Sequence, residues 1–304
     1  MGAALTAAAR HGDVVARAAA LRKMPDLREL HLSYLRLSDA AAAAIFGASA
    51  RRVHPALTKL RSLHITHTDM TPPDAADLAA SGWRLEELAL LAHHRLGAAG
   101  VAALVAAPTF ALRRLQLVEC HLDVAALLAL VDAPWPLEEL DLSLNDFRAA
   151  AAGPALVALA QRVGMRRLAV NDCRLRAAGF KALVEAVCPA LTHLAIRSAT
   201  AADDGPDALG AAAFAGLPAL EELDLSSSSL GPAAALRLAA RPRARLRRMN
   251  LSRTRIGDAG FAALAGGSWA ALEWLDLCGN HLTGEPTLEE ARRWAPCLSF
   301  FYAE

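Results

Sequence analysis

The sequence predicts an α/β fold in which about ten strand-helix units follow one another and their strands form one parallel sheet. The first observation is a repeat: the pattern LxxLxL, followed about five residues later by another apolar residue, recurs along the 304 residues at intervals of 25 to 29, with one interval of 33. Within each copy the apolar residues alternate with polar ones, as in a half-buried strand. The second half of several copies has apolar residues at helical spacing.

The pattern occurs in ten copies. The first apolar residues of these copies are Leu27, Leu60, Leu85, Leu112, Leu137, Met165, Leu191, Leu220, Leu246 and Leu272. In the copy at Leu137, Leu140 and Leu142 point to one side of the strand, and Asp141 points to the other. Helices are expected after the strands, most clearly over residues 96–104, 175–183 and 256–264. No repeat buries its leucine row alone, so neighbouring repeats stabilise one another.

The two ends are expected to cap the array. Residues 1–26 predict a capping helix with no strand before it, residues 27–282 form the ten repeats, and residues 283–304 form a C-terminal cap. The C-terminal cap contains a helix at about 286–295 and a truncated strand at Leu298 and Phe300. The whole chain is expected to be a single solenoid domain.

After each strand, one turn position requires a side chain that bonds to buried backbone groups. Asn145 and Asn280 fit this role best, because an amide both donates and accepts hydrogen bonds. Leu35 and Ala199 depart from the pattern. Weaker candidates for the same position are Thr68, Cys120, Cys173, Ser228 and Thr254.

These repeats resemble the leucine-rich repeat family over nearly the whole chain. The full helix in each repeat is similar to the ribonuclease-inhibitor-like subfamily. Cys120 and Cys173 at the turn, with the segment 187–191, resemble the cysteine-containing variant found in F-box adaptor proteins. The resemblance implies a solenoid of horseshoe type, with its parallel strands on a concave face that binds other molecules.

The composition excludes several classes of function. With 72 Ala and 52 Leu the chain has material for a large core, and a net charge of +1 gives no general attraction to nucleic acid or membranes. Five widely spaced cysteines without a CxxC pair indicate a reduced protein, expected in the cytoplasm or alternatively in the nucleus. The longest uncharged stretch, 96–112, belongs to the repeats, so no transmembrane segment is expected. Neither a cofactor nor a nucleic-acid partner is expected. We also expect the protein to be monomeric by itself.

The candidate binding residues lie on the concave face, where strand side chains are free to contact a protein partner. The histidines at 31 and 64 occupy equivalent places on adjacent strands, which suggests a patch that gains charge near about pH 6.5. A metal site is not expected, because the pattern places no cysteine or carboxylate at ligand spacing beside them and exposed histidines are common. The predicted contact residues are His31, Tyr34, His64, His67, Leu91, Arg114, Val118, Leu144, Arg167 and Trp274.

Charged pairs precede the second leucine of most repeats, and acidic and basic pairs alternate along much of the array. Stacked strands bring these pairs together, which favours an intramolecular charge ladder over a partner surface, at about 0.2 to 1 kcal/mol per exposed contact. The pairs are Arg28-Glu29, Arg61-Ser62, Glu86-Glu87, Arg113-Arg114, Glu138-Glu139, Arg166-Arg167, Thr192-His193, Glu221-Glu222, Arg247-Arg248 and Glu273-Trp274.

The sequence therefore predicts a non-enzymatic scaffold that binds a protein on its concave face. It contains no phosphate-binding GxxxxGK[ST], HExxH or GxSxG motif. The family resemblance implies two alternatives. One is a substrate-recognition subunit of a ubiquitin ligase, and the other is an activator of a Ran-type GTPase.

Overall fold

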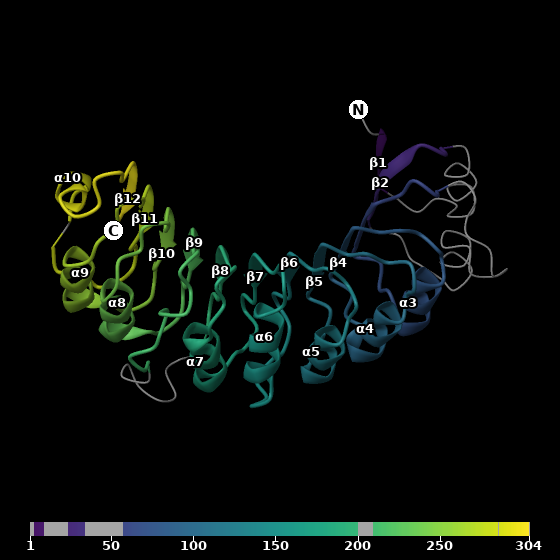
Figure 1. Cartoon of the computed structure of the whole chain (residues 1–304), viewed down its shortest axis with the longest axis horizontal. Coiled ribbons are helices and arrows are strands. Elements are labelled where there is room, and N and C mark those ends of the chain that lie inside the picture. The colour runs from purple at the N-terminus through teal and green to yellow at the C-terminus, as the bar shows by residue number, and fades with distance from the viewer. Residues whose placement is uncertain (1–2, 9–23, 34–56, 200–208, 285, 304) are drawn as a thin grey trace. The chain divides into compact units, whose positions relative to one another are not determined.

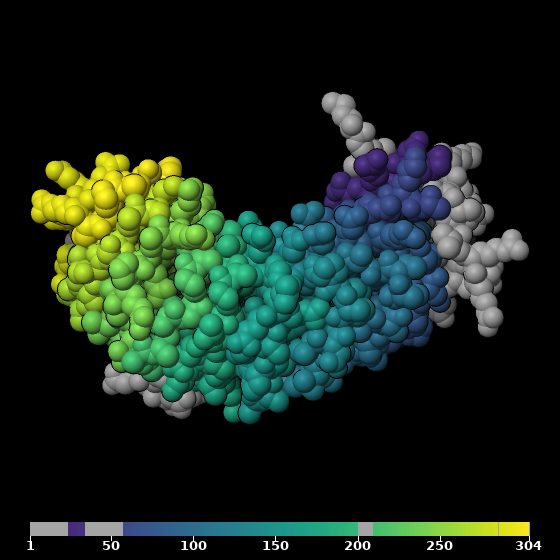
Figure 2. Space-filling model, viewed as in Figure 1, coloured from purple at the N-terminus to yellow at the C-terminus, as the bar shows by residue number. Residues whose placement is uncertain are grey.

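The computed structural model describes residues 3–8, 24–33, 57–199, 209–284 and 286–303 (Figure 1). The chain divides into two compact units, Met1–Asp146 (unit 1) and Phe147–Glu304 (unit 2), and each is described by itself. The space-filling view shows that neighbouring repeats within each unit are in continuous contact (Figure 2). The prediction that all repeats form one domain stays a prediction.

Unit 1 is a parallel sheet with helices on one side of it (Figure 1). Its strands follow chain order, each hydrogen-bonded to the next, as the repeat pattern predicts. They are β1 (Ala3–Ala8), β2 (Leu27–Ser33), β3 (Ser62–Thr66), β4 (Glu87–Leu91), β5 (Arg114–Val118) and β6 (Glu139–Asp141). The helices described are α3 (Pro72–Ala79), α4 (Gly97–Val105) and α5 (Val124–Val131).

The start of the chain differs from the expected capping helix. Residues 3–8 form strand β1, which pairs in parallel with β2, with Leu5 opposite Leu30. Pairing with the free edge of β2 satisfies backbone groups that a helix would leave open, and this outweighs the helix preference of an alanine-rich segment. The rest of the predicted helix, residues 9–23, lies outside the described residues.

Unit 2 repeats the same arrangement. Its strands are β7 (Arg167–Ala169), β8 (His193–Ala195), β9 (Glu222–Asp224), β10 (Arg248–Asn250), β11 (Trp274–Asp276) and β12 (Phe300–Tyr302). Its helices are α6 (Ala152–Ala160), α7 (Ala177–Glu185), α8 (Gly231–Ala239), α9 (Gly257–Ala265) and the short α10 (Leu288–Arg292). The α/β repeat fold with a parallel sheet is thus confirmed, and β12 lies where the truncated last strand is expected.

The core is the row of repeat leucines between the sheet and the helices. Leu63, Leu88 and Leu115 are paired neighbours on β3, β4 and β5, and all three are buried. Each buried leucine contributes about 1.5 to 3 kcal/mol relative to an exposed one. Among the described residues, no helix has the length and apolar character needed to span a membrane.

The turns that the structure describes after the strands from β3 to β11 share one backbone feature. The residue just before the turn position is in the left-handed region, where glycine is favoured. Yet only one of these residues is a glycine. The residues are His67, Ala92, Glu119, Leu144, Asp172, Ser198, Ser227, Arg253 and Gly279.

Candidate functional site

The candidate site is the side of the unit 1 sheet that carries no helices, which we call the open face. Its side chains come from alternate residues of the strands, because successive side chains of a strand point to opposite sides. They lie in rows across neighbouring strands, since the strands are parallel and in register. The rows contain Glu29, His31, Ser33, Ser62, His64, Thr66, Glu87, Ala89, Leu91, Arg114, Gln116, Val118, Glu139 and Asp141.

Two histidines lie together at one end of the open face, as the sequence predicts. His31 of β2 pairs with His64 of β3, and the two rings stack with centroids 4.3 Å apart and planes 19° apart. The Nε2 atom of His31 lies 2.6 Å from Oε1 of Glu29, which is two residues earlier on the same face. His64 Nε2 lies 3.1 Å from Ser62 Oγ and 3.4 Å from Glu87 Oε1.

The expectation that no carboxylate lies at ligand spacing beside these histidines is wrong, because Glu29 does. Glu29 and His31 are two positions apart on one strand, with only Leu30 between them, a spacing that places both on the same face. The Glu29 carboxylate contacts His31 directly, and this contact lowers the pKa of the Glu29 carboxyl. Burial, and then the neighbouring His31, lowers the pKa of His64. The signal was present in the sequence as the alternating segment Glu29-Leu30-His31.

A short apolar row lies next to the histidines on the open face. Leu91 of β4 pairs with Val118 of β5, and Leu144 follows the end of the next strand, β6. Leu144 is 48% exposed, and its backbone is in the left-handed region with φ of 61°. Leucine in this conformation is unfavourable by about 1 to 2 kcal/mol. Leu91 and Val118 therefore lie side by side, whereas Leu144 lies one residue beyond Ser143, which is the residue in register with Val118.

The charged residues of unit 1 mostly satisfy one another, as the charge-ladder hypothesis predicts. Arg114 Nη2 lies 3.4 Å from Glu87 Oε2, and Arg61 Nε lies 3.5 Å from Glu86 Oε1. Arg113 pairs with Glu138. All these side chains keep a substantial exposure, so each pair adds little to stability. Arg114 is therefore a rung of the ladder as well as a predicted contact residue.

The remaining predicted residues lie elsewhere. His67 is exposed in the turn after β3, while Arg167 and Trp274 are on β7 and β11 of unit 2. The Trp274 ring is tilted against Tyr302 of β12, with centroids 6.2 Å apart, so it packs on the C-terminal strand. Tyr34 lies outside the described residues. Unit 2 also has an ion pair, between Arg247 and Glu273 at 3.4 Å.

His93, whose role the sequence pattern does not indicate, is the buried turn residue of its repeat. Its Nε2 is 2.9 Å from Ile65 O, and its Nδ1 accepts from Met70 N at 3.3 Å. Asn145 bonds to the same two backbone positions of its preceding repeat, Leu117 O and Leu122 N. These partners assign the proton of the neutral ring to Nε2. His93 thus replaces the asparagine of other repeats.

Burial lowers the pKa of His93 below its usual value of 6.5, against smaller opposing effects of Ile65 O and Asp69. The unfolded chain therefore binds more protons at this residue as the pH falls below 6.5, and the folded state loses stability over that range. A protonated ring also cannot accept the Met70 N–H.

We expect His93→Asn to remove this part of the pH dependence, because asparagine makes the same bonds without titrating. The measurement is the urea midpoint at about pH 7.5 and about pH 5. The midpoint of the wild type should fall more between these two values than that of His93→Asn. His121→Asn, which alters an exposed ring of the same unit, is the control and should keep the wild-type drop. Equal drops for all three proteins would contradict the assigned role.

Two buried cysteines, Cys120 and Cys188, are poor candidates for nucleophiles. Burial raises the pKa of the Cys120 thiol to about 12, and this thiol donates to Leu90 O at 3.3 Å. Burial also raises the pKa of Cys188. A thiol with a raised pKa is a poor nucleophile at neutral pH. These two cysteines therefore serve packing.

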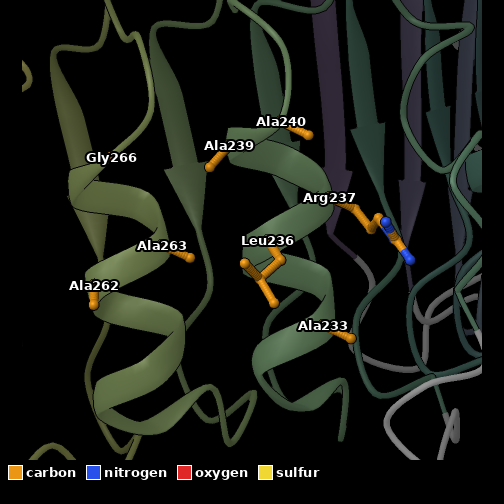
Figure 3. Close-up of a pocket in the computed structure, with 8 residues that line it drawn as sticks. All are labelled: Ala233, Leu236, Arg237, Ala239, Ala240, Ala262, Ala263 and Gly266. Atoms are coloured by element: carbon orange, nitrogen blue, oxygen red, sulfur yellow. The ribbon is translucent and has the colours of Figure 1, made fainter.

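A surface pocket of about 480 Å³ lies between α8 and α9 of unit 2, on the helical side of the sheet (Figure 3). Its lining is mostly alanine, with Leu236 beside it, and Arg237 points away from α9 (Figure 3). A binding pocket usually combines apolar lining with convergent polar groups. This pocket has one charged residue in its lining, Arg237.

No protein-family model and no curated protein sequence matches the chain. Solved structures of leucine-rich repeat proteins do resemble it. Rad7, from the structure of the Rad7 and Elc1 complex in yeast, is 20% identical with a TM-score of 0.59, over 91% of this chain and 69% of that chain. TLR13, from the TLR13-ssRNA13 complex, is 19% identical with a TM-score of 0.56, over 93% of this chain but only 36% of that chain. The fold is therefore that of the leucine-rich repeat solenoids.

Proposed function

We propose that the chain is a non-enzymatic interaction module that binds a protein partner on the open face of unit 1. The observation that carries this proposal is the apolar pair of Leu91 and Val118 on the open face, with the 48% exposed Leu144 one residue beyond their row, in the turn after β6. Protein interfaces typically combine an apolar centre with a polar rim. The Glu87–Arg114 pair and the histidine stack supply such a rim.

The comparisons support a partner of this class. Rad7 was solved in a complex with Elc1, and a protein partner for the present chain is proposed by analogy. TLR13 was solved with single-stranded RNA, but a net charge of +1 does not favour nucleic acid here. The proposal includes membership of the ribonuclease-inhibitor-like, F-box-associated subfamily, a monomeric state in isolation and a location in the cytoplasm.

The test compares two triple variants of matched composition. One is Leu91→Ala with Val118→Ala and Leu144→Ala on the open face. The other is Leu128→Ala with Val163→Ala and Leu236→Ala, which removes two leucines and one valine that are 53%, 98% and 54% exposed away from that face. Each variant and the wild type are immobilised and exposed to a native lysate, and the retained proteins are quantified by mass spectrometry.

We expect proteins that are retained by the wild type and the second variant to be depleted at least tenfold by the open-face variant, the equivalent of about 1.4 kcal/mol of binding free energy. Equal retention by all three would contradict the proposal and direct attention to the helices. Cullin-ligase subunits among the depleted proteins would favour the ubiquitin-ligase alternative. Faster GTP hydrolysis by a small GTPase would instead support the activator alternative.

A further inference from the structure

The structure also points to a metal site on the open face, and we propose that Glu29, His31 and His64 bind one divalent transition-metal ion of the zinc type. Two of the three side chains come from β2 and the third from the paired residue of β3. One ligand atom of each lies within 4.8 Å of the ligand atoms of the other two. This inference does not depend on the proposed function.

The backbone brings these groups together without any special loop. Glu29 and His31 share a face because they are two residues apart on a strand. His64 is the register partner of His31, so its ring must lie beside that of His31. The ring stacking at 4.3 Å shows that the two imidazoles already lie in contact. The sheet therefore holds a two-histidine, one-carboxylate set on rigid elements.

The donor set fits zinc chemistry. Imidazole nitrogen and carboxylate oxygen bind Zn²⁺ at about 2.0 to 2.2 Å, commonly in tetrahedral geometry. The ion would take the place of the proton between His31 Nε2 and Glu29 Oε1, which are now 2.6 Å apart. The two stacked rings would have to turn for their in-plane nitrogen lone pairs to converge on one ion, and the partial exposure of Glu29, His31 and His64 leaves room for this change of rotamer. Three protein ligands leave one position for water.

The surroundings add negative charge that favours a cation. Glu87 Oε1 lies 3.4 Å from His64 Nε2, and Glu87 Oε2 lies 3.4 Å from Arg114 Nη2. Glu87 is thus fixed beside the trio by its own partner. The Glu87 carboxylate therefore adds negative charge beside His64.

A second pair of histidines in unit 1 provides a matched control. The rings of His94 and His121 have centroids 4.9 Å apart at a tilt of 42°, and His94 Nε2 lies 4.0 Å from Glu119 Oε1. These groups resemble the proposed ligands in type, although His94 and His121 are more exposed than His31 and His64. However, among the described residues only the trio of Glu29, His31 and His64 converges closely enough to hold an ion.

The experiment uses the full chain without a polyhistidine tag, stripped with a chelator and titrated with Zn²⁺ by calorimetry. Co²⁺ is then titrated while the visible absorption bands of a tetrahedral site are recorded. We expect one equivalent of Zn²⁺ per chain. His31→Gln with His64→Gln should lose this binding, and Glu29→Gln should weaken it by about tenfold or more.

His94→Gln with His121→Gln should bind Zn²⁺ like the wild type. Circular dichroism checks that each variant is folded. The milder Glu29→Gln keeps the test decisive if the double histidine variant does not fold. The proposal would be overturned if the wild type did not bind Zn²⁺, or if the control variant lost binding to the same extent as the His31→Gln, His64→Gln variant. It would also be overturned if Glu29→Gln and the His31→Gln, His64→Gln variant both bound Zn²⁺ like the wild type.

Discussion

Leu223→Asp is expected to unfold the region around β9 at a much lower denaturant concentration than the wild type. Leu223 is 1% exposed and pairs with Leu194 on one side and Met249 on the other. An aspartate here would place a carboxylate in the leucine row with no cation to pair with it. Burying an unpaired charge makes this one of the most destabilising kinds of substitution, about 3 to 5 kcal/mol.

The measurement is the urea midpoint and slope, followed by circular dichroism. Arg114→Ala is the surface control and should change stability by less than about 1 kcal/mol, because its pair with Glu87 is exposed. If Leu223→Asp and the wild type unfolded at the same midpoint, the assignment of Leu223 to the core would be contradicted.

Asn280→Ala is the second substitution with a large expected effect. The Asn280 amide donates to Leu251 O and Leu277 O, both at 2.7 Å, and accepts from Thr254 N and Ile256 N at 3.0 and 3.2 Å. Alanine would leave four buried backbone groups without this partner. Since each unsatisfied buried group costs about 1 to 3 kcal/mol, a loss of about 3 kcal/mol or more is expected.

Asn250→Ala is the matched control, because Asn250 lies on the open side of β10 and bonds to Ser252 and Asp224 at the surface. Its effect should stay below about 1 kcal/mol. Thermal or urea denaturation of both variants distinguishes the two positions. A loss for Asn280→Ala as small as that for Asn250→Ala would show that the amide bonds do not support the turn.

The sequence predicts the strands and the leucine core well because both follow from a pattern that is local and repeated. Strands with leucines at alternate positions bury one face whatever lies around them. The sequence does not predict β1, because residues 3–8 have no repeat pattern and only the free edge of β2 makes them a strand. Such an edge is a tertiary feature.

The sequence predicts those features of the candidate site that depend on strand register, but not those that depend on side-chain conformation. The adjacency of His31 and His64 is confirmed, since register alone determines it. The turn role of His93 is missed, because that repeat reaches its next apolar residue, Leu96, one residue late and histidine is not expected at the position. The contact of Glu29 with His31 depends on side-chain rotamers that a pattern does not specify.

Buried turn side chains form hydrogen bonds with the repeat that precedes them in the chain. Asn145 bonds back to Leu117, His93 back to Ile65, and Asn280 back to Leu251. Each repeat is therefore completed by the one that follows it in the chain. Removing a repeat from the C-terminal end would leave the backbone groups at the turn of the preceding repeat without their side-chain partner. Removing a repeat from the N-terminal end would leave the bonds at the turn of the following repeat unchanged. Newly synthesised repeats would accordingly become stable one step after they emerge.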